Sequence, residues 1–456
     1  MARDVFDATP IESRDQLVES LESGCKPRSE WRVGTEHEKF GFSLDDRSPV
    51  PYDGPRGIRR LLEAMEGLLG WQPIVDGGRI VGLTDPIGLA AITLEPGGQF
   101  ELSGAPLATI HQTCREVNAH LAQVRECATP LGIGFLGVGF SPKWTLAATP
   151  RMPKSRYAIM TRYMPKVGGH GLDMMYRTCT IQANLDFSDE ADMVMKMRVG
   201  LALQPVVTAL FANSPFTEGR PNGYRTYRSE VWRDTDPDRT GMLPFAFEDG
   251  FGFERYVDWA LDVPMYFVKR GDTYHDVAGS SFRDLLAGRL GTLPGEHATM
   301  SDWNNHLTTL FPEVRLKRFL EMRGADGGPS RRICAVPALW VGLIYDSVAL
   351  DAAWEIVKDW TAEEREDLRG SIPRLALDAP IRNRTVRDVA RDVLALARDG
   401  LGRRGRDNQE GLDETIYLSS LDEVVASGVT PADRLLAEFT GEWQGDIDRV
   451  FAAYAY

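Results

Sequence analysis

Hydrophobic and polar positions along the chain follow two different periods. Apolar residues three and four apart, such as Leu61, Leu62, Met65 and Leu68, predict amphipathic helices. Strict alternation, as in residues 177–187, predicts half-buried strands. The predicted helices cover residues 12–24, 58–69, 108–130 and a long segment from the N-cap Ser188 towards Asn213, and the predicted strands cover residues 32–43, 79–84, 90–103, 133–140, 177–187, 263–269 and 318–324.

The order of these elements predicts the fold class. Strands and helices do not alternate regularly, which disfavours a doubly wound parallel sheet. We expect an α+β fold with a mainly antiparallel curved sheet, helices packed on one face and polar groups on the other. Thr385 and Thr430 are suited to begin helices in the last third of the chain. We expect a single domain over residues 1–456, in which the strand-rich first half and residues 315–330 form the site and residues 335–456 are mostly helical.

Carboxylates gather on two of the predicted strands. In residues 34–40, the period of two places Glu36 and Glu38 on one strand face. In residues 94–102, Glu95 and Glu101 share a face in the same way. Like charges raise each other's pKa and destabilise such a cluster unless a cation lies between them. A hard divalent cation with oxygen ligands removes the conflict, and Mg²⁺ is the usual ion beside phosphates.

A third strand, residues 179–187, has one apolar and one polar face. Its polar face carries Thr180, Gln182, Asn184 and Asp186. Taken alone, this face is explained by a surface strand with a solvated side. Together with the carboxylate strands, it indicates one polar concavity.

Residues 315–328 place Glu321 and Arg323 on one strand face, followed by a glycine-rich stretch. A plain salt bridge explains the pair by itself. Beside a metal and a triphosphate, Glu321 would bind metal and Arg323 would stabilise charge on the transferred phosphoryl group. The glycines would let backbone N–H groups approach an anion.

Residues 213–224 form a polar, turn-rich segment, and Arg225 and Arg228 follow it. A surface connection is one interpretation. The other is a substrate loop whose arginines bind an amino-acid carboxylate as a fork.

Composition excludes several classes of function. The 456 residues carry a net charge of −14, which argues against nucleic-acid binding because no basic surplus offsets phosphates. No run of about 18 apolar residues appears, so we expect no membrane span. The five cysteines show no CxxC spacing, and the acidic N-terminus shows no signal-peptide core. We therefore expect neither a zinc site nor a disulfide framework, and a reducing cytoplasm.

These motifs together resemble the plant-type glutamate–cysteine ligases, a form that also occurs in bacteria, and we expect a bacterial member. The resemblance covers nearly the whole chain. It rests on the carboxylate strands, on Glu321 and Arg323, and on further motifs at residues 23–26, 31–42, 135–140, 163–168, 213–219, 321–328 and 441–443.

The resemblance implies a single catalytic domain with the glutamine-synthetase-like fold of carboxylate–amine ligases. It implies that ATP converts the γ-carboxylate of glutamate into an acyl phosphate, which the amino group of cysteine attacks to give γ-glutamylcysteine for glutathione synthesis. Mg²⁺, with Mn²⁺ as the alternative, is the implied metal, and a monomer and a homodimer both stay open. The implied metal ligands are Glu36, Glu38, Glu95, Glu101, Glu321 and the weaker candidate Gln182; the implied catalytic residues are Arg323 and Glu321; and the implied substrate-binding residues are Arg228, Thr180 and Asn184.

Two other functions stay open at this point. One is a γ-glutamyl ligase with another amine acceptor or one that serves ergothioneine synthesis, because small pockets discriminate by only about 1–3 kcal/mol per methylene. The other is a non-catalytic metal- or nucleotide-binding protein. For the ligase, Glu36→Gln or Glu321→Gln is expected to abolish turnover and leave stability near that of the wild type.

Overall fold

A large antiparallel sheet forms the centre of the protein in the computed structural model, which describes residues 7–456. Within these residues the sheet has nine strands in the order β14-β15-β7-β1-β5-β4-β3-β2, and β6 pairs with the end of β1. All neighbours are antiparallel. The strands are β1 (Val33–Ser43), β2 (Gln72–Asp76), β3 (Arg79–Thr84), β4 (Ala91–Leu94), β5 (Phe100–Ser103), β6 (Ile133–Leu136), β7 (Thr180–Leu185), β14 (Val314–Leu316) and β15 (Leu320–Asp326).

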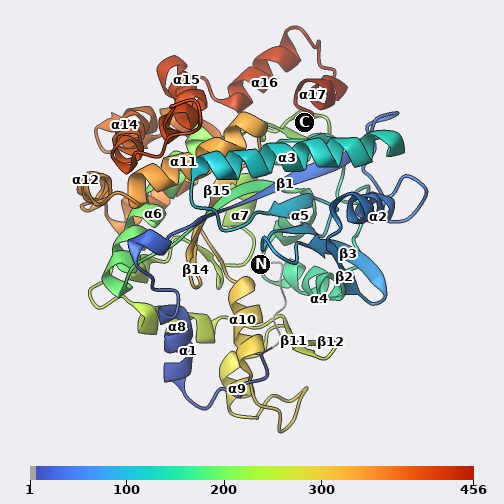
Figure 1. The fold of residues 1–456 in the computed structure, drawn as a ribbon, viewed down its shortest axis with the longest axis vertical. Helices are drawn as coiled ribbons and strands as arrows, with labels where there is room; N and C mark the ends of the chain where they lie inside the picture. Colours follow the sequence, from blue (N-terminus) through green and yellow to red (C-terminus); the bar gives the residue numbers. More distant parts are fainter. Residues whose placement is uncertain (1–6) are drawn as a thin grey trace.

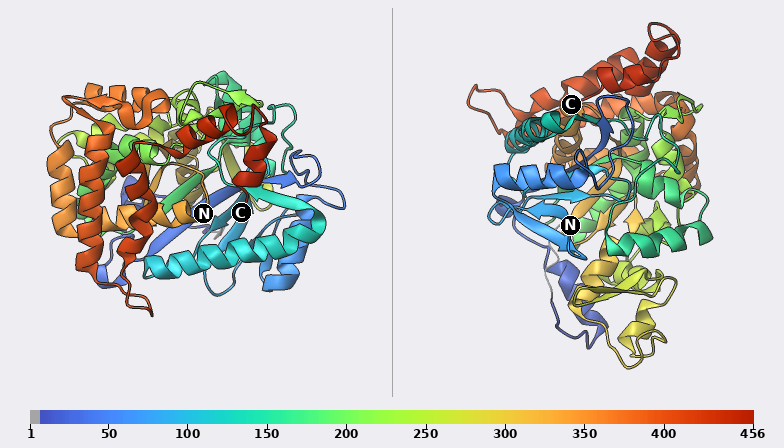
Figure 2. Two further views of the ribbon diagram at one scale, coloured as in Figure 1. Left: turned by 90° about the horizontal axis from the view of Figure 1, so that it is seen from above. Right: turned by 90° about the vertical axis from the view of Figure 1, so that its right-hand side faces the viewer.

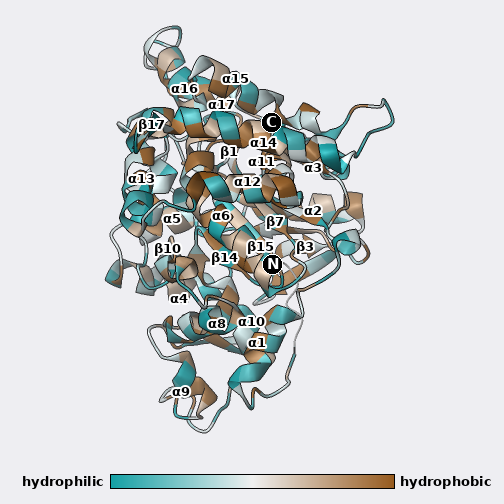
Figure 3. Ribbon diagram, turned by 90° about the vertical axis from the view of Figure 1, so that its left-hand side faces the viewer, coloured by the Kyte–Doolittle hydropathy of each residue, from teal (hydrophilic) through white to brown (hydrophobic). Residues whose placement is uncertain are grey.

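Long helices cover one face of this sheet (Figures 1 and 2). Helix α6 packs on β15, α11 on β7 and β1, and α3 on β1, while α14 packs on the outer side of α11. Hydrophobic residues concentrate along the inner helices α6 and α11 (Figure 3), because these helices are enclosed on several sides. The helices of this layer are α3 (Ile110–Ala128), α6 (Glu190–Leu210), α11 (Ser330–Ile344), α12 (Ser347–Val357), α13 (Ala362–Leu375) and α14 (Val386–Arg404).

Smaller elements complete the two ends and the second face of the molecule. Figure 1 shows α14 to α17 at one end and α1, α8, α9 and α10 at the other. The remaining helices are α1 (Arg14–Glu22), α2 (Ile58–Leu69), α4 (Ser155–Tyr163), α5 (Gly171–Arg177), α7 (Tyr227–Arg233), α8 (Phe253–Asp262), α9 (Phe282–Leu286), α10 (Met300–Thr308), α15 (Ser419–Ser427), α16 (Pro431–Thr440) and α17 (Asp448–Ala453). Short strand pairs are β8 (Phe216–Thr217) with β9 (Arg220–Pro221), β10 (Thr240–Gly241) with β13 (Phe311–Pro312), β11 (Phe267–Arg270) with β12 (Thr273–Asp276) and β16 (Pro380–Ile381) with β17 (Arg384–Thr385).

The structure confirms most predicted elements and corrects two of them. Thr385 and Thr430 are the N-caps of α14 and α16. The N-cap of α6 is Asp189, one residue after the predicted Ser188. Residues 90–103 form the hairpin β4–β5 and not one strand, because a turn at Glu95–Gln99 reverses the chain and Gly98 adopts a φ of +86°. That residues 1–456 form one catalytic domain stays a prediction.

Helix α6 is long and apolar enough to cross a membrane by length and composition alone, and α11 with α12 passes the same test as a pair bent by 90°. However, 83% of the most apolar window of α6 is buried among the described residues. This burial is typical of a core helix. Such helices are weak evidence for a membrane span.

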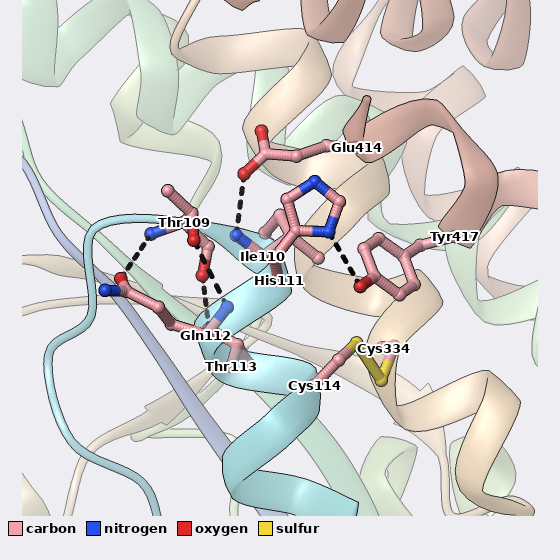
Figure 4. Close-up of a disulfide and its surroundings, with 9 residues drawn as sticks. All are labelled: Thr109, Ile110, His111, Gln112, Thr113, Cys114, Cys334, Glu414 and Tyr417. Atoms are coloured by element: carbon pink, nitrogen blue, oxygen red, sulfur yellow. Dashed lines mark hydrogen bonds between the residues drawn. A yellow bond between two sulfur atoms is a disulfide. The ribbon is translucent and has the colours of Figure 1, made fainter. Parts of the chain in front are cut away.

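A disulfide links α3 to α11, contrary to the expectation from cysteine spacing. Cys114 and Cys334 are bonded, with their Cα atoms 5.7 Å apart, and Figure 4 shows them beside the start of α3. Nearby, Glu414 accepts a hydrogen bond from the Ile110 backbone N–H, and His111 contacts the Tyr417 hydroxyl. The two cysteines are 220 residues apart. Spacing along the chain could not reveal the pair, because it depends on how the two helices pack.

Candidate active site

The sheet register brings the predicted polar residues together around the central strand β1. Glu38 lies directly opposite Glu101 on β5, and Glu36 lies opposite Gln182 on β7. One strand further, Glu321 of β15 lies opposite Asn184 of β7. Directly opposite residues have Cβ atoms about 4.5–5.5 Å apart. Four strands that are distant in sequence therefore place these carboxylates and amides in one region.

Glu95 reaches the same region from the turn of the β4–β5 hairpin. Its backbone N–H donates to the Gln99 carbonyl and its carbonyl accepts from Gly98, which closes the turn. A side chain at Gly97 would lie 2.2 Å from the Tyr176 carbonyl oxygen, so the turn needs glycine for this close approach. The carboxylates Glu95 and Glu101 thus share a region through a hairpin, and not through one strand face.

Two adjoining cavities lie over this polar face of the sheet. The inner cavity has a volume of about 90 Å³ and the outer cavity about 670 Å³. Glu95, Glu101, Arg156 and Thr308 line both. The inner cavity is further lined by residues that include Glu38, Thr180, Gln182, Arg228, Trp232, Phe311, Arg315 and Arg323, and the outer cavity by residues that include Ile74, Val81, Lys154, Lys269, Leu307, Lys317 and Arg318.

Glu38 and Glu101 have no ion-pair partner among the described residues, and each disfavours the charged form of its neighbours. Burial, with Glu101 and Glu95 nearby, raises the pKa of Glu38 well above its usual value, although Arg228 opposes the shift. Burial, Glu36 and Glu95 raise the pKa of Glu101 to about 8. The hydrogen bonds to these carboxylates come from neutral donors, namely the Thr180 backbone N–H to Glu38 and the Thr93 and Ser103 hydroxyls to Glu101. This part of the site is short of positive charge.

Glu321 has the opposite environment. Arg315 Nε donates to its Oε2 at 2.5 Å, Lys317 pairs with its Oε1, and Arg323 lies 3.2 Å from Oε2. Although burial opposes the shift, these three cations hold the pKa of Glu321 well below its usual value. Glu321 and Arg315 both have fully buried side chains. The Glu321–Arg323 pair expected from the strand pattern is present, within a larger ion cluster.

Glu36 lies beneath the cavity wall. It is 2% exposed, and its carboxylate accepts from Asn184 Nδ2 at 2.9 Å and from Gln182 Nε2 at 3.5 Å. Neither Glu36, Asn184 nor Glu321 belongs to the lining of the two cavities. Asn184 lies outside the lining of both cavities and donates to the Glu36 carboxylate, so its role in substrate binding stays a prediction.

Arg228 and Thr180 both reach the inner cavity. Arg228 donates to the backbone carbonyl of Arg323 at 2.8 Å and of Gly324 at 3.3 Å, and its buried Nε has no hydrogen-bond partner in the described chain. The Thr180 hydroxyl donates to the Ala325 carbonyl at 2.8 Å. Arg228 therefore has a free donor for a ligand, whereas the Thr180 hydroxyl proton is already used.

Two groups near this site are already paired in the structure. The Arg225 side chain pairs with Asp433 of α16, which favours the interpretation of this segment as a surface connection. The Gly327 N–H donates to the Cys179 carbonyl, so this N–H is not free for an anion.

The sequence analysis did not identify most of the basic residues that line the two cavities. Lys154 and Arg156 come from the start of α4, and Arg315 and Lys317 from the strand and turn before Glu321. A signal for the last two was present: Arg315, Lys317, Glu321 and Arg323 lie at odd positions of one short stretch, which a hairpin brings to one face. No comparable pattern indicated Lys154 or Arg156.

The residues present fit a divalent cation at the carboxylate side of the site. Among residues 7–456, no three carboxylate, imidazole or thiol groups already converge as a ready ion site. The oxygens of Glu38, Glu95 and Glu101 are nevertheless the donor type that Mg²⁺ prefers, and their mutual repulsion is what a cation relieves. Glu36, Gln182 and Glu321 lie next to this group, and Glu321 is held by its own cations.

Comparison with known proteins agrees with this geometry. A family model described as glutamate-cysteine ligase family 2 matches residues 32–453. The chain is 57% identical to the chloroplastic glutamate–cysteine ligase of Nicotiana tabacum, over 99% of this chain and 84% of that protein. It is 56% identical to the chloroplastic enzyme of Medicago truncatula, over 99% of this chain and 87% of that protein.

The fold is also similar to that of a solved glutamate–cysteine ligase from Francisella tularensis in complex with AMP. The TM-score is 0.54 at 12% sequence identity, and the match covers 93% of this chain and 89% of that one. This likeness confirms the predicted fold class of a mixed helical and antiparallel carboxylate–amine ligase. The family match over most of the chain and the high identity to full-length relatives show that the chain belongs to glutamate-cysteine ligase family 2 and is a ligase.

Proposed function

We propose that the two cavities join the γ-carboxylate of L-glutamate to the amino group of L-cysteine at the expense of ATP. The products are γ-glutamylcysteine, ADP and phosphate, and the reaction passes through γ-glutamyl phosphate. One observation carries the proposal: carboxylates without an ion-pair partner and arginines line the same inner cavity. Phosphoryl transfer between two anions needs metal-binding and anion-binding groups in one site more than it needs a dedicated base.

The sizes of the two cavities support the binding of ATP in the outer cavity and of the amino acids in the inner cavity. The outer cavity of about 670 Å³ can hold a nucleotide, and its lining includes apolar side chains and lysines. The solved relative from Francisella tularensis is a complex with AMP, which supports an adenine nucleotide as a ligand of this chain. The inner cavity then holds glutamate and cysteine, with the γ-phosphate at the junction that Glu95, Glu101 and Arg156 line.

The arginines of the inner cavity have separate roles in this proposal. Arg228 offers its unpartnered Nε to a carboxylate of glutamate. Arg323 stays charged at neutral pH even though burial and Arg315 lower its pKa to about 10, and it would stabilise the phosphoryl oxygens. Thr180 contributes to the substrate wall through its position in the lining.

Glu36, Glu38, Glu95, Glu101, Gln182 and Glu321 are the residues that would hold Mg²⁺, or Mn²⁺ in its place. The metal, when bound, would neutralise the charge on the phosphates. The chain's own part is to supply oxygen ligands and to keep them free of competing cations at Glu38 and Glu101. The apolar side chains Trp232 and Phe311 in the lining would limit access of water to the acyl phosphate.

Replacing Arg323 with lysine is expected to lower kcat by about 100-fold or more. Nη1 of Arg323 contacts both Gln182 and Glu321, and a single ammonium group that takes over these contacts leaves no second planar nitrogen for the phosphoryl oxygens. The KM for glutamate is expected to change little. Steady-state kinetics of ADP release measure both values. Arg406→Lys, the same swap at an exposed arginine outside both cavities, is the matched control. Near-normal turnover of Arg323→Lys would remove Arg323 from the chemistry.

The direct test of the function is ADP release with different amine acceptors. We expect turnover with glutamate plus cysteine and slower turnover with 2-aminobutyrate or alanine, which have no thiol. Product identification by mass spectrometry then distinguishes γ-glutamylcysteine from other γ-glutamyl amides. A faster reaction with another acceptor would favour the alternative γ-glutamyl ligase, including one that serves ergothioneine synthesis. No ATP turnover with any acceptor would favour a non-catalytic binding protein.

Three further expectations belong to this proposal. The chain acts in a bacterial cytoplasm, on small molecules and not on nucleic acid or membrane. It acts as a monomer or a homodimer. The acidic net charge of −14 supports the exclusion of nucleic acid.

A further inference from the structure

One charged group at the site has no assigned task. Glu321 is already neutralised by Arg315, whose Nε and terminal nitrogen both contact Oε2 at 2.5 Å. Arg315 is itself fixed by donating to the carbonyls of Thr308 and Leu310, at 2.9 Å each. One anchored arginine satisfies a buried carboxylate. Lys317 is therefore a second cation on a carboxylate that does not need it for stability.

The charges around Glu321 confirm this excess. Glu36 and Glu321 contribute two negative charges, while Arg315, Lys317 and Arg323 contribute three positive ones. Burial and Arg315 lower the pKa of Lys317, whereas Glu321 and Glu36 oppose that shift, so its ammonium group acts on both carboxylates. By contrast, Glu38 and Glu101 lie opposite each other without an ion-pair partner among the described residues, and Arg228 only partly offsets the raised pKa of Glu38. The site thus has two halves. Around Glu38 and Glu101 negative charge lacks a counter-charge, and around Glu321 positive charge exceeds negative charge.

The position of Lys317 allows it to move. It lies in the tight turn between β14 and β15, where its backbone N–H donates to the Phe319 carbonyl. Its side chain is 13% exposed and lines the outer cavity, whereas Glu321 and Arg315 are fully buried. Among the described residues, the hydrogen-bond partner of its Nζ is Glu321. A lysine on a flexible stem can leave such a pair more easily than an arginine held by three contacts.

We propose that the Lys317 ammonium takes the place of a divalent cation beside Glu321 and Glu36 while no nucleotide is bound, and turns to the phosphates of ATP when the nucleotide enters the outer cavity. Lys317 is then a positioning residue that makes metal loading at Glu321 depend on the nucleotide. At Glu38, Glu95 and Glu101 no lysine of the described chain occupies the position of the metal ion, so this half binds its divalent cation first. This inference rests on the proposed function, because it assumes that the carboxylates hold metal and that ATP is the nucleotide.

The test is Mn²⁺ binding to the intact protein without nucleotide, followed by electron paramagnetic resonance of free Mn²⁺. Lys317→Met is expected to bind one more equivalent of Mn²⁺ than the wild type, or to bind it about tenfold more tightly, because the competing charge is gone. Lys317→Arg keeps a cation at the turn and is expected to behave like the wild type. Arg406→Met is the matched control, since it removes one positive charge from an exposed residue outside both cavities.

A second readout follows the nucleotide. With Mn²⁺ saturating, Lys317→Met is expected to bind ADP about tenfold more weakly than the wild type, because a phosphate partner is lost. Arg315 and Arg323 still neutralise Glu321 in this variant, so circular dichroism and thermal unfolding are expected to show an intact fold.

The possible failures are distinguishable. Equal Mn²⁺ binding by the wild type, Lys317→Met and Arg406→Met would overturn the role of Lys317 and leave the proposed function intact. Equally tighter binding by Lys317→Met and Arg406→Met would also overturn it, because the effect would then be one of net charge. Absence of Mn²⁺ binding in every protein, with and without ADP, would overturn the metal centre and the role of Lys317 with it.

Discussion

Glu101→Gln is expected to stabilise the metal-free protein and to lower turnover by about 100-fold or more. Glu101 is 4% exposed and lies directly opposite Glu38, with Glu36 and Glu95 as further negative neighbours. Glutamine keeps the shape and removes the repulsion, so the free energy of unfolding rises. The same change removes a charged oxygen ligand, and turnover falls because phosphoryl transfer depends on charge neutralisation.

The stabilisation should depend on pH with a defined sign. The pKa of Glu101 is raised from 4.5 to about 8 in the folded protein. Between these values the folded state holds a proton that the unfolded state has lost, so the stability of the wild type falls as pH rises from about 5 to about 8. Glu101→Gln has no proton to lose at this position, so its stability does not fall with pH for this reason. Its advantage is expected to be small at pH 5 and to reach a few kcal/mol at pH 8.5.

Urea unfolding in the presence of a chelator measures this difference. Glu126→Gln, at an exposed position of α3, is the control and is expected to match the wild type in stability and turnover. Addition of Mg²⁺ should stabilise the wild type more than Glu101→Gln. An equal pH dependence in the two proteins would mean that Glu101 has no unfavourable charge to relieve.

Glu321→Gln is expected to abolish turnover and to destabilise the protein by about 3–5 kcal/mol, because removing one partner leaves buried cations without a counter-charge. Arg315 loses its partner in a place where its side chain is fully buried, and Lys317 and Arg323 lie next to it. The sequence alone led to the expectation of near-wild-type stability for this variant. The structure corrects it, since the three cations were not part of that argument.

A double variant separates charge from packing. Arg315→Met with Glu321→Gln removes both partners of the buried pair and is expected to recover part of the stability that Glu321→Gln loses. Turnover is not expected to recover, because the carboxylate is still absent. Thermal unfolding and ADP release measure the two effects on the same samples. Wild-type stability of the single variant would show that Glu321 is not the counter-charge of this cluster.

Much of the fold and the carboxylate group could be predicted because both follow local periods. Alternation along β1 and β7 fixed the faces of Glu36, Glu38 and Gln182, and the sheet then brought these faces together. The sequence did not predict the turn at Glu95–Gln99. Glu95, Gly97 and Gln99 stand at every second position, so they continue the alternating pattern of a strand through the turn. The error did not displace Glu95 from the site, since both arms of the hairpin lie beside it.

The rest depends on contacts between segments that no local pattern encodes. Cys114 meets Cys334 only through the packing of α3 on α11. Arg156 reaches the cavity from α4, a helix without carboxylate neighbours in sequence. Asn184 was predicted to bind substrate because it shares the polar face of β7 with Gln182, but two residues further along the strand it lies outside the cavity lining and contacts Glu36. The position of a residue along a strand determines which face of the sheet its side chain lies on. Tertiary packing determines whether that side chain reaches the cavity.

The most direct measurement of the central claim is the position of Mn²⁺ in crystals grown with a non-hydrolysable ATP analogue and glutamate. Anomalous diffraction at the manganese edge locates the ion independently of any assumption about its ligands. The account predicts manganese in contact with carboxylate oxygens of Glu38, Glu95 and Glu101, at the junction of the inner and outer cavities. Manganese bound only elsewhere, or an ATP analogue seated without any ion at these residues in an active preparation, would contradict it.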